Sequence, residues 1–320
     1  MKTLMKALLA VAAVTTLNYA PSASAFPDKE VSIVVGFAAG GLADQGARTW
    51  ARYASPFLGR PVIVLNKPGF GGVIAANEVA KATPDGHTLS FFTPGPFVVQ
   101  PHFGDVPYKV PDSFVPIITQ YINPIIIASP SDAPYHSLRE LIEFAKRNPG
   151  KVRYSSSGAA GIERFAIERL QQVAGFQLTI IPFKASSEAT TALLGKHVEL
   201  TTAYLPDLKR HFDAGTLRAI VSLGFERNDL PLGNIATARE AGYDVVGITY
   251  SGLLAPQGTP QAVINQLHDA FKQAQDTPEF KESMERLGIR VRYMNGQAFL
   301  QQIKLDYETN GRLIKALGIK

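Results

Sequence analysis

The sequence predicts an α/β protein of two domains with a cleft between them. Short β-branched strands alternate with helical segments, and this alternation restarts near residue 125. Once a 25-residue leader is set aside, 295 of the 320 residues remain. A chain of that length exceeds what one hydrophobic core usually supports, so two domains are expected. Helices between the strands supply the crossover connections that parallel neighbours need, which favours mostly parallel sheets.

The N-terminus has the three parts of a secretory signal peptide. Lys2 and Lys6 precede an apolar run over 7–17, and Ala23-Ser24-Ala25 supplies small residues for cleavage. The apolar run is about half of the roughly 20 residues needed to cross a bilayer. Residues 1–25 are therefore expected to be a signal peptide that is cleaved after Ala25.

Composition excludes several kinds of protein. The chain has no cysteine, which rules out disulfides, thiolate metal sites and cysteine nucleophiles. Setting the leader aside removes two lysines and no acids, so the formal net charge falls from +5 to +3. No cluster of basic residues with interleaved aromatics accompanies this mild charge, so no nucleic acid partner is expected.

The first domain is expected to comprise residues 26–124 and 246–320. A strand over 31–35 leads through a glycine loop into a helix over 43–57, and this unit then repeats. The other predicted elements are strands at 62–65, 88–92 and 291–293 and helices at 74–81, 261–287 and 296–317.

Residues 125–245 are expected to form the second domain. Ser137 is a typical N-cap for a helix that runs to Lys146. Ligands in such α/β sheets bind outside the carboxyl ends of the strands, here in a cleft formed where crossing strands join the domains. The other predicted elements are strands at 125–128, 152–155, 178–183, 198–203 and 217–223 and helices at 162–174 and 187–194.

Two glycine-rich loops, each between a strand and a helix, are candidate anion sites. They cover residues 37–41 and 155–161. Free backbone N–H groups and the positive end of the helix dipole both favour an anion at such a position. The structural alternative for each is a turn that only lets a helix pack on a strand. Two such loops in two domains favour capture of a carboxylate.

Enzyme signatures are missing from the chain. The stretch 36–41 is neither a dinucleotide motif nor a P-loop, because Leu42 stands where a lysine is required. No nucleophile elbow and no zinc-protease motif occurs. The six histidines lack metal-ligand spacing, so no metal or cofactor is expected. A hydrolase using Ser155 or Ser157 would lack a base, and a binding protein is therefore favoured over an enzyme.

Short motifs occur in a characteristic order along the mature chain. They are GFAAGG at 36–41 with Asp44 and Ala47-Arg48, NKPGFGG at 66–72, AKATPDG at 80–86, NPGK at 148–151, LLG at 193–195, GLLAP at 252–256 and GTP at 258–260. This ordered set resembles the periplasmic binding proteins of tripartite tricarboxylate transporters, often called the Bug family. The resemblance implies a Venus-flytrap fold with a hinged cleft, a periplasmic location, a monomer, and delivery of an anionic ligand to a membrane permease.

In this family the two glycine loops hold one ligand carboxylate through backbone amides. Thr93, which follows the strand over 88–92, is a further candidate contact in this chain. Carried onto this sequence, the loop contacts implied by the resemblance are Phe37, Ala38, Ala39, Gly40, Ser155, Ser157, Gly158 and Ala160.

Two departures from the family pattern bear on the ligand. Relatives that resemble amino-acid binders carry an aspartate after the strand over 198–202, where this chain has Ala203 and Tyr204. An ammonium group would be left unpaired there, which argues against an amino acid. Where many relatives have histidine, this chain has Arg164, whose guanidinium could hold a second carboxylate bidentately. The structural alternative for Arg164 is an ion pair with Glu163 or Glu168.

Aromatic residues could wall the cleft, although core packing is the alternative for each of them. The candidates are Phe37, Phe97, Tyr204 and Tyr250. An aromatic dicarboxylate such as terephthalate is favoured, with an aliphatic di- or tricarboxylate such as citrate as the alternative. An alternative function is ligand binding for a periplasmic sensor system. That function would require the same site.

Overall fold

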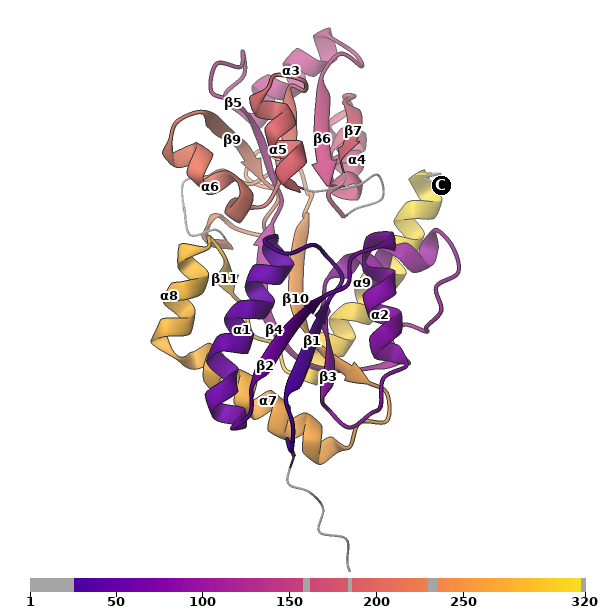
Figure 1. Ribbon diagram of the computed structural model, residues 1–320. Helices are drawn as coiled ribbons and strands as arrows, with labels where there is room; N and C mark the ends of the chain where they lie inside the picture. The colour runs from indigo at the N-terminus through magenta and orange to yellow at the C-terminus, as the bar shows by residue number, and fades with distance from the viewer. Residues whose placement is uncertain (1–25, 158–161, 184–185, 230–234, 318–320) are drawn as a thin grey trace, which may run out of the picture.

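The computed structural model describes residues 26–157, 162–183, 186–229 and 235–317. The predicted signal peptide and its cleavage site lie outside these residues. The described part forms two domains, each with its own sheet, drawn one above the other in Figure 1. No helix in these four ranges is long and apolar enough to cross a membrane.

The first domain has strands in the order β11-β4-β10-β3-β1-β2. One face of this sheet packs against α1, α7 and α8, and the other against α2, α9 and the short helix η2. The strands are β1 (Val31–Val35), β2 (Val62–Asn66), β3 (Thr88–Phe92), β4 (Phe114–Pro124), β10 (Ile248–Pro256) and β11 (Arg290–Val291). The helices are α1 (Leu42–Leu58), α2 (Val73–Ala80), η2 (Gly95–Val99), α7 (Gln261–Asp276), α8 (Pro278–Arg286) and α9 (Gly296–Leu317), with short turns η1 (Phe70–Gly72) and η3 (Gln100–His102).

The second domain has strands in the order β7-β6-β8-β5-β9. Helices α3 and α4 contribute to the core on one face of the sheet, and α5 and α6 to the core on the other. The strands are β5 (Ile126–Pro130), β6 (Arg153–Ser157), β7 (Thr179–Phe183), β8 (Leu200–Ala203) and β9 (Leu217–Ser222). The helices are α3 (Leu138–Arg147), α4 (Ile162–Ala174), α5 (Ser186–Leu194) and α6 (Leu205–Asp213), with a short turn η4 (Arg227–Asp229).

The prediction of mostly parallel sheets is wrong, because both sheets are mixed. Strands β1, β2 and β3 are parallel, but β10 and β4 are antiparallel to their neighbours, as is β5 in the second sheet. The chain leaves the first domain through β4 and returns through β10. These crossing strands run in opposite directions side by side, and that gives each sheet an antiparallel part.

The long helix predicted over 261–287 is also two helices. Pro278 occupies the first position of α8, and the hydroxyl of Thr277 accepts a hydrogen bond from the amide of Phe280 at 3.2 Å. A proline favours the first turn of a helix and disrupts a helix interior, so the chain ends α7 and caps a new helix here. The strand predicted at 291–293 is shorter and lies at β11.

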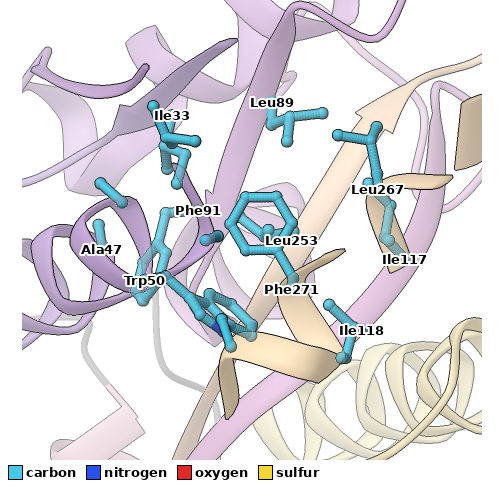
Figure 2. Packing of buried hydrophobic residues seen from close by; sticks show 14 of the residues in the cluster. Ile33, Ala47, Trp50, Leu89, Phe91, Ile117, Ile118, Leu253, Leu267 and Phe271 are labelled. Atoms are coloured by element: carbon cyan, nitrogen blue, oxygen red, sulfur yellow. The ribbon is translucent and has the colours of Figure 1, made fainter. Parts of the chain in front are cut away.

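The core of the first domain is built around α1. Trp50 is fully buried between Phe91 on β3 and Phe271 on α7, with ring centroids 6.3 and 5.4 Å away in edge-to-face geometry. Figure 2 shows these rings beside Ile33 of β1. Each buried aromatic removes a large apolar surface from water. This packing fixes the middle of α1 against β3 and α7.

Candidate functional site

The loop after β1 and the end of β6 both lie where the two domains meet. In Figure 1, β1 runs up toward the second domain and β6 runs down toward the first. Strands β1, β2 and β3 are parallel, and so are β6, β7 and β8, so the carboxyl ends of each set lie at one edge of its sheet. This is where open α/β sheets bind ligands.

A polar network holds the loop after β1. Asp44 is 3 % exposed in the first turn of α1. Its carboxylate accepts hydrogen bonds from the amide of Gly40 at 2.8 Å, Nδ2 of Asn66 at 2.9 Å and Nε of Arg48 at 3.0 Å. Asn66 Nδ2 also donates to the carbonyl of Phe37 at 3.0 Å. The network therefore forms hydrogen bonds at both ends of the loop, at Phe37 and at Gly40.

The ionised form of Asp44 is stabilised in this network. Burial alone would raise its pKa, but the hydrogen bonds from Arg48, Gly40 and Asn66 and the positive charge of Arg48 outweigh burial and lower the pKa below its ordinary value. The loop is thus held by a carboxylate that remains charged at neutral pH.

The backbone of this loop presents free donors. Residues 37 to 40 are exposed, and the amides of Phe37, Ala38 and Ala39 donate no hydrogen bond to another described residue. Gly40 has a φ of +87°, a left-handed conformation that favours glycine. Helix α1 starts at Leu42 with no side-chain cap at Gly41. Free amides at an uncapped helix N-terminus form an arrangement that attracts an anion.

A second glycine stretch lies against this loop. A Cβ on Gly36 would stand only 2.7 Å from the Cα of Gly72, so the two backbones touch where any larger side chain would collide. Beside this contact, Phe70 is 83 % exposed. Sequence reasoning included these glycines among the motifs but gave them no role.

In the second domain, the structure places Ser155 inside the sheet. Ser155 is fully buried, and its hydroxyl donates to the carbonyl of Ala189 at 3.0 Å and lies 2.9 Å from the Thr201 hydroxyl. Its side chain therefore supports α5 and β8. The side chain of Ser157 and all of Gly158 and Ala160 lie outside the described residues, so these predicted contacts stay predictions.

Arg164 forms the ion pair that was its structural alternative. Its Nε lies 3.7 Å from Oε1 of Glu168, one turn further along α4, and its side chain is 24 % exposed. The pair lies at partial exposure, where an ion pair contributes little to stability. The role of Arg164 toward a second carboxylate stays a prediction.

Two of the aromatic candidates pack in the core of the first domain. Phe97 is 1 % exposed and stacks on Phe92 at 4.9 Å. The hydroxyl of Tyr250 donates to Oδ2 of Asp306 on α9 at 2.6 Å. Phe37, by contrast, is 38 % exposed in its loop. Thr93 is half-buried, and its hydroxyl has no hydrogen-bond partner among the described residues.

Ala203 ends β8, and Tyr204 is the N-cap residue of α6 that follows it. Ala203 is buried in the core of the second domain. Burial and the neighbouring carboxylate of Glu163 raise the pKa of Tyr204 well above its ordinary value, and its hydroxyl contacts Thr249 of β10. Tyr204 therefore reaches from the second domain to a crossing strand.

Sequence reasoning named Glu163 only as a possible partner of Arg164 and missed Asp207. Glu163 is buried in the first turn of α4. Asp207 lies in the first turn of α6, and its Oδ2 accepts a hydrogen bond from the hydroxyl of Ser186 at 2.7 Å. Burial raises the pKa of Asp207 above its ordinary value. Glu163 follows β6 and Asp207 follows β8, and acids placed shortly after strand ends were the signal available in the sequence.

The comparisons with known proteins agree with this geometry. The profile of the "Tripartite tricarboxylate transporter family receptor" matches residues 47–319. A relative from Cupriavidus necator, "UPF0065 protein in gbd 5'region", is 34 % identical over 305 residues, which is 93 % of this chain and 90 % of the relative.

Two solved structures are similar over nearly their whole length. The periplasmic binding protein BugD is 31 % identical with a TM-score of 0.81, over 92 % of this chain and 99 % of BugD. A protein of R. palustris solved with adipate is 25 % identical with a TM-score of 0.83, over 92 % of this chain and 98 % of that protein.

Fold, loop geometry and these likenesses define a periplasmic-type solute-binding protein. The chain belongs to the tripartite tricarboxylate transporter receptor family. It is a solute-binding receptor of this family and not an enzyme. The family prediction made from the ordered motifs is confirmed.

Proposed function

We propose that this protein captures a small dicarboxylate in the periplasm and delivers it to the permease of a tripartite transporter. The observation that carries the proposal is the braced loop after β1, whose three free amides precede an uncapped helix N-terminus at the edge of the first sheet. Amide donors fixed in place bind a carboxylate without the entropic cost of ordering the loop.

A second acid group is proposed from the charges around the site. Arg164 follows the serine-glycine loop in α4, and its guanidinium is proposed to exchange the carboxylate of Glu168, 3.7 Å away, for that of a ligand. Ala203 supplies no charge for an ammonium group, and Asp207 is already engaged by Ser186. A dicarboxylate is therefore proposed over an amino acid.

The aromatic character of the ligand has less support than its charge. Of the candidate aromatic residues, Phe97, Tyr204 and Tyr250 are buried in the cores, which leaves only Phe37 exposed. The R. palustris structure contains adipate, an aliphatic diacid. Terephthalate and adipate are therefore the two compounds to compare directly.

Capture is proposed to proceed by closure of the domains about the crossing strands. The carboxylate binds first to the loop after β1, and the second domain completes the site when the domains close. A ligand shifts this equilibrium by its differential contacts with the two states. The closed form is then the one that the permease distinguishes from the empty receptor.

A thermal-shift screen tests the proposal. Terephthalate, adipate, citrate and succinate are compared with benzoate and glutamate at equal concentration, and hits are titrated by calorimetry. Diacids are expected to raise the unfolding temperature more than benzoate does. Stabilisation by glutamate alone would contradict the proposed ligand class.

Replacing Arg164 tests the second acid group. Arg164→Ala is expected to weaken the best diacid by roughly tenfold to a hundredfold, the range for a charge-assisted hydrogen bond, while benzoate changes little. Arg169→Ala is the matched control, because Arg169 is exposed on the same helix. Equal losses for diacid and benzoate would refute a two-ended ligand.

A further inference from the structure

One side chain of the second domain is buried in the core of the first. Phe165 on α4 is 2 % exposed and belongs to the apolar cluster that includes Phe97, Tyr250 and Phe299 of the first domain. The next residue, Ala166, packs in the core of the second domain. Helix α4 therefore anchors in its own domain and inserts one aromatic ring into the other.

The ring of Phe165 stacks on a residue of the first domain. Its centroid lies 5.9 Å from that of Phe103, with an interplanar angle of 18°. Phe103 follows η3 and is partly exposed. Offset stacking of two aromatic rings adds to the gain from burying them. Separating the domains on this side would expose both rings to water.

A second apolar contact joins the domains on the opposite face of the first sheet. Leu205, at the start of α6, packs so tightly on Gly288 that a Cβ there would stand 3.0 Å from its Cγ. Gly288 follows α8, whose Met284 lies in the core on the α1 face. Figure 1 shows α6 above α8 on one side of the waist and α4 above α9 on the other. The two contacts therefore flank the crossing strands.

Helix α4 also links this contact to the candidate ligand loop. It begins at Ile162, directly after the serine-glycine loop. It rests on the crossing segment as well, since a Cβ on Gly247 would stand only 2.6 Å from the Cβ of Ala166.

We propose that Phe165 with Phe103, and Leu205 with Gly288, form an apolar clasp that favours the closed arrangement of the domains before any ligand binds. The ligand affinity is then set partly by residues that never touch the ligand. The apparent dissociation constant equals the intrinsic one divided by the fraction of receptor that is binding-competent. Weakening the clasp lowers that fraction.

The size of the effect follows from the surface involved. Burying a phenylalanine ring shifts an equilibrium by about tenfold to a hundredfold. Phe165→Ala is therefore expected to move the ligand-free protein toward the open form by up to this factor. Phe103→Ala is expected to shift the ligand-free protein in the same direction by a smaller factor. Phe103 is only partly buried, so its truncation removes less buried apolar surface.

Small-angle scattering of the ligand-free protein tests the clasp without assuming any ligand. The wild type, Phe165→Ala and Phe103→Ala are compared with Phe176→Ala as the matched control. Phe176 is 5 % exposed just after α4 and belongs to the core cluster of the second domain. The radius of gyration is expected to rise in the two clasp variants and to stay unchanged in the control. Equal values in all four proteins would overturn the proposal.

Affinity supplies the second readout, and only this arm rests on the proposed function. Calorimetry with adipate and terephthalate is expected to give a weaker apparent affinity for Phe165→Ala by about tenfold or more, with Phe176→Ala within about twofold of wild type. Wild-type protein that binds neither acid would refute the proposed ligand class, while the scattering result would still decide the clasp. Expansion without any loss of affinity would refute the link between clasp and binding.

Discussion

The loop after β1 and the end of β6 begin from similar sequence patterns and use their polar residues differently. In the first, Asp44 and Asn66 form hydrogen bonds with the backbone of Gly40 and Phe37 and leave the other amides of this exposed loop free. In the second, the Ser155 hydroxyl is bound to Ala189 and Thr201 inside the sheet. A strand that leads into a glycine loop therefore does not by itself reveal which polar groups face the ligand. The buried partners of those groups decide it.

The largest effect is expected from Asp44→Ala. Removing this carboxylate frees the amide of Gly40 and the side chain of Asn66, so the loop loses the geometry that holds three amides together. Ligand affinity is expected to fall by about a hundredfold, because a loop must then be ordered on binding. Calorimetry with the best diacid of the screen measures the loss.

Asp213→Ala is the control for this substitution. Asp213 is an exposed aspartate that pairs with Lys209 on α6, outside both loops. It is expected to leave affinity unchanged. A similar fall in both variants would mean that the loss at Asp44 reflects general damage and not the loop.

Ser155→Ala is expected to give the reverse pattern. The substitution leaves the Thr201 hydroxyl without this neighbour in a fully buried place, which costs about 1 to 3 kcal/mol of stability. Affinity is expected to stay within about twofold of wild type, since the side chain does not reach the interdomain edge. Chemical denaturation and calorimetry on one preparation separate the two quantities, and a large affinity loss at unchanged stability would place Ser155 in the ligand site after all.

The smallest effect concerns pH. The pKa of Asp44 is lowered in the folded protein, so its contribution to stability is present above the ordinary aspartate pKa of about 3.9 and is lost as the pH falls through the folded value. Below about pH 4, the wild type is expected to lose stability more steeply than Asp44→Asn. Denaturation midpoints from pH 3 to 6 measure this difference, and parallel curves would show that the network does not depend on the charge.

Much of the fold could be predicted because helices and caps carry local signals. Ser137 caps α3 as expected, and its hydroxyl accepts a hydrogen bond from the amide of Glu140 at 3.3 Å. The crossing strands β4 and β10 were not located in the sequence. Both are buried along nearly their whole length, so they lack the alternation of apolar and polar residues that identifies a half-exposed strand.

The site was harder to predict than the fold. The position of the loop after β1 could be predicted from its glycines and from the strand that precedes it. This loop lies exposed at the edge of the first domain. Side-chain roles depend on long-range packing. Tyr250 points to Asp306 on α9, 56 positions away, and Phe165 packs in the other domain. No spacing rule within one segment reports such contacts.

The central claim is that the free amides of the loop after β1 bind a carboxylate. Amide chemical shifts of the ¹⁵N-labelled, deuterated protein, recorded during titration with adipate and terephthalate, test this directly. The account predicts large downfield proton shifts for Phe37, Ala38 and Ala39 that saturate with the calorimetric affinity. Saturable binding that leaves these three amides unmoved would contradict it.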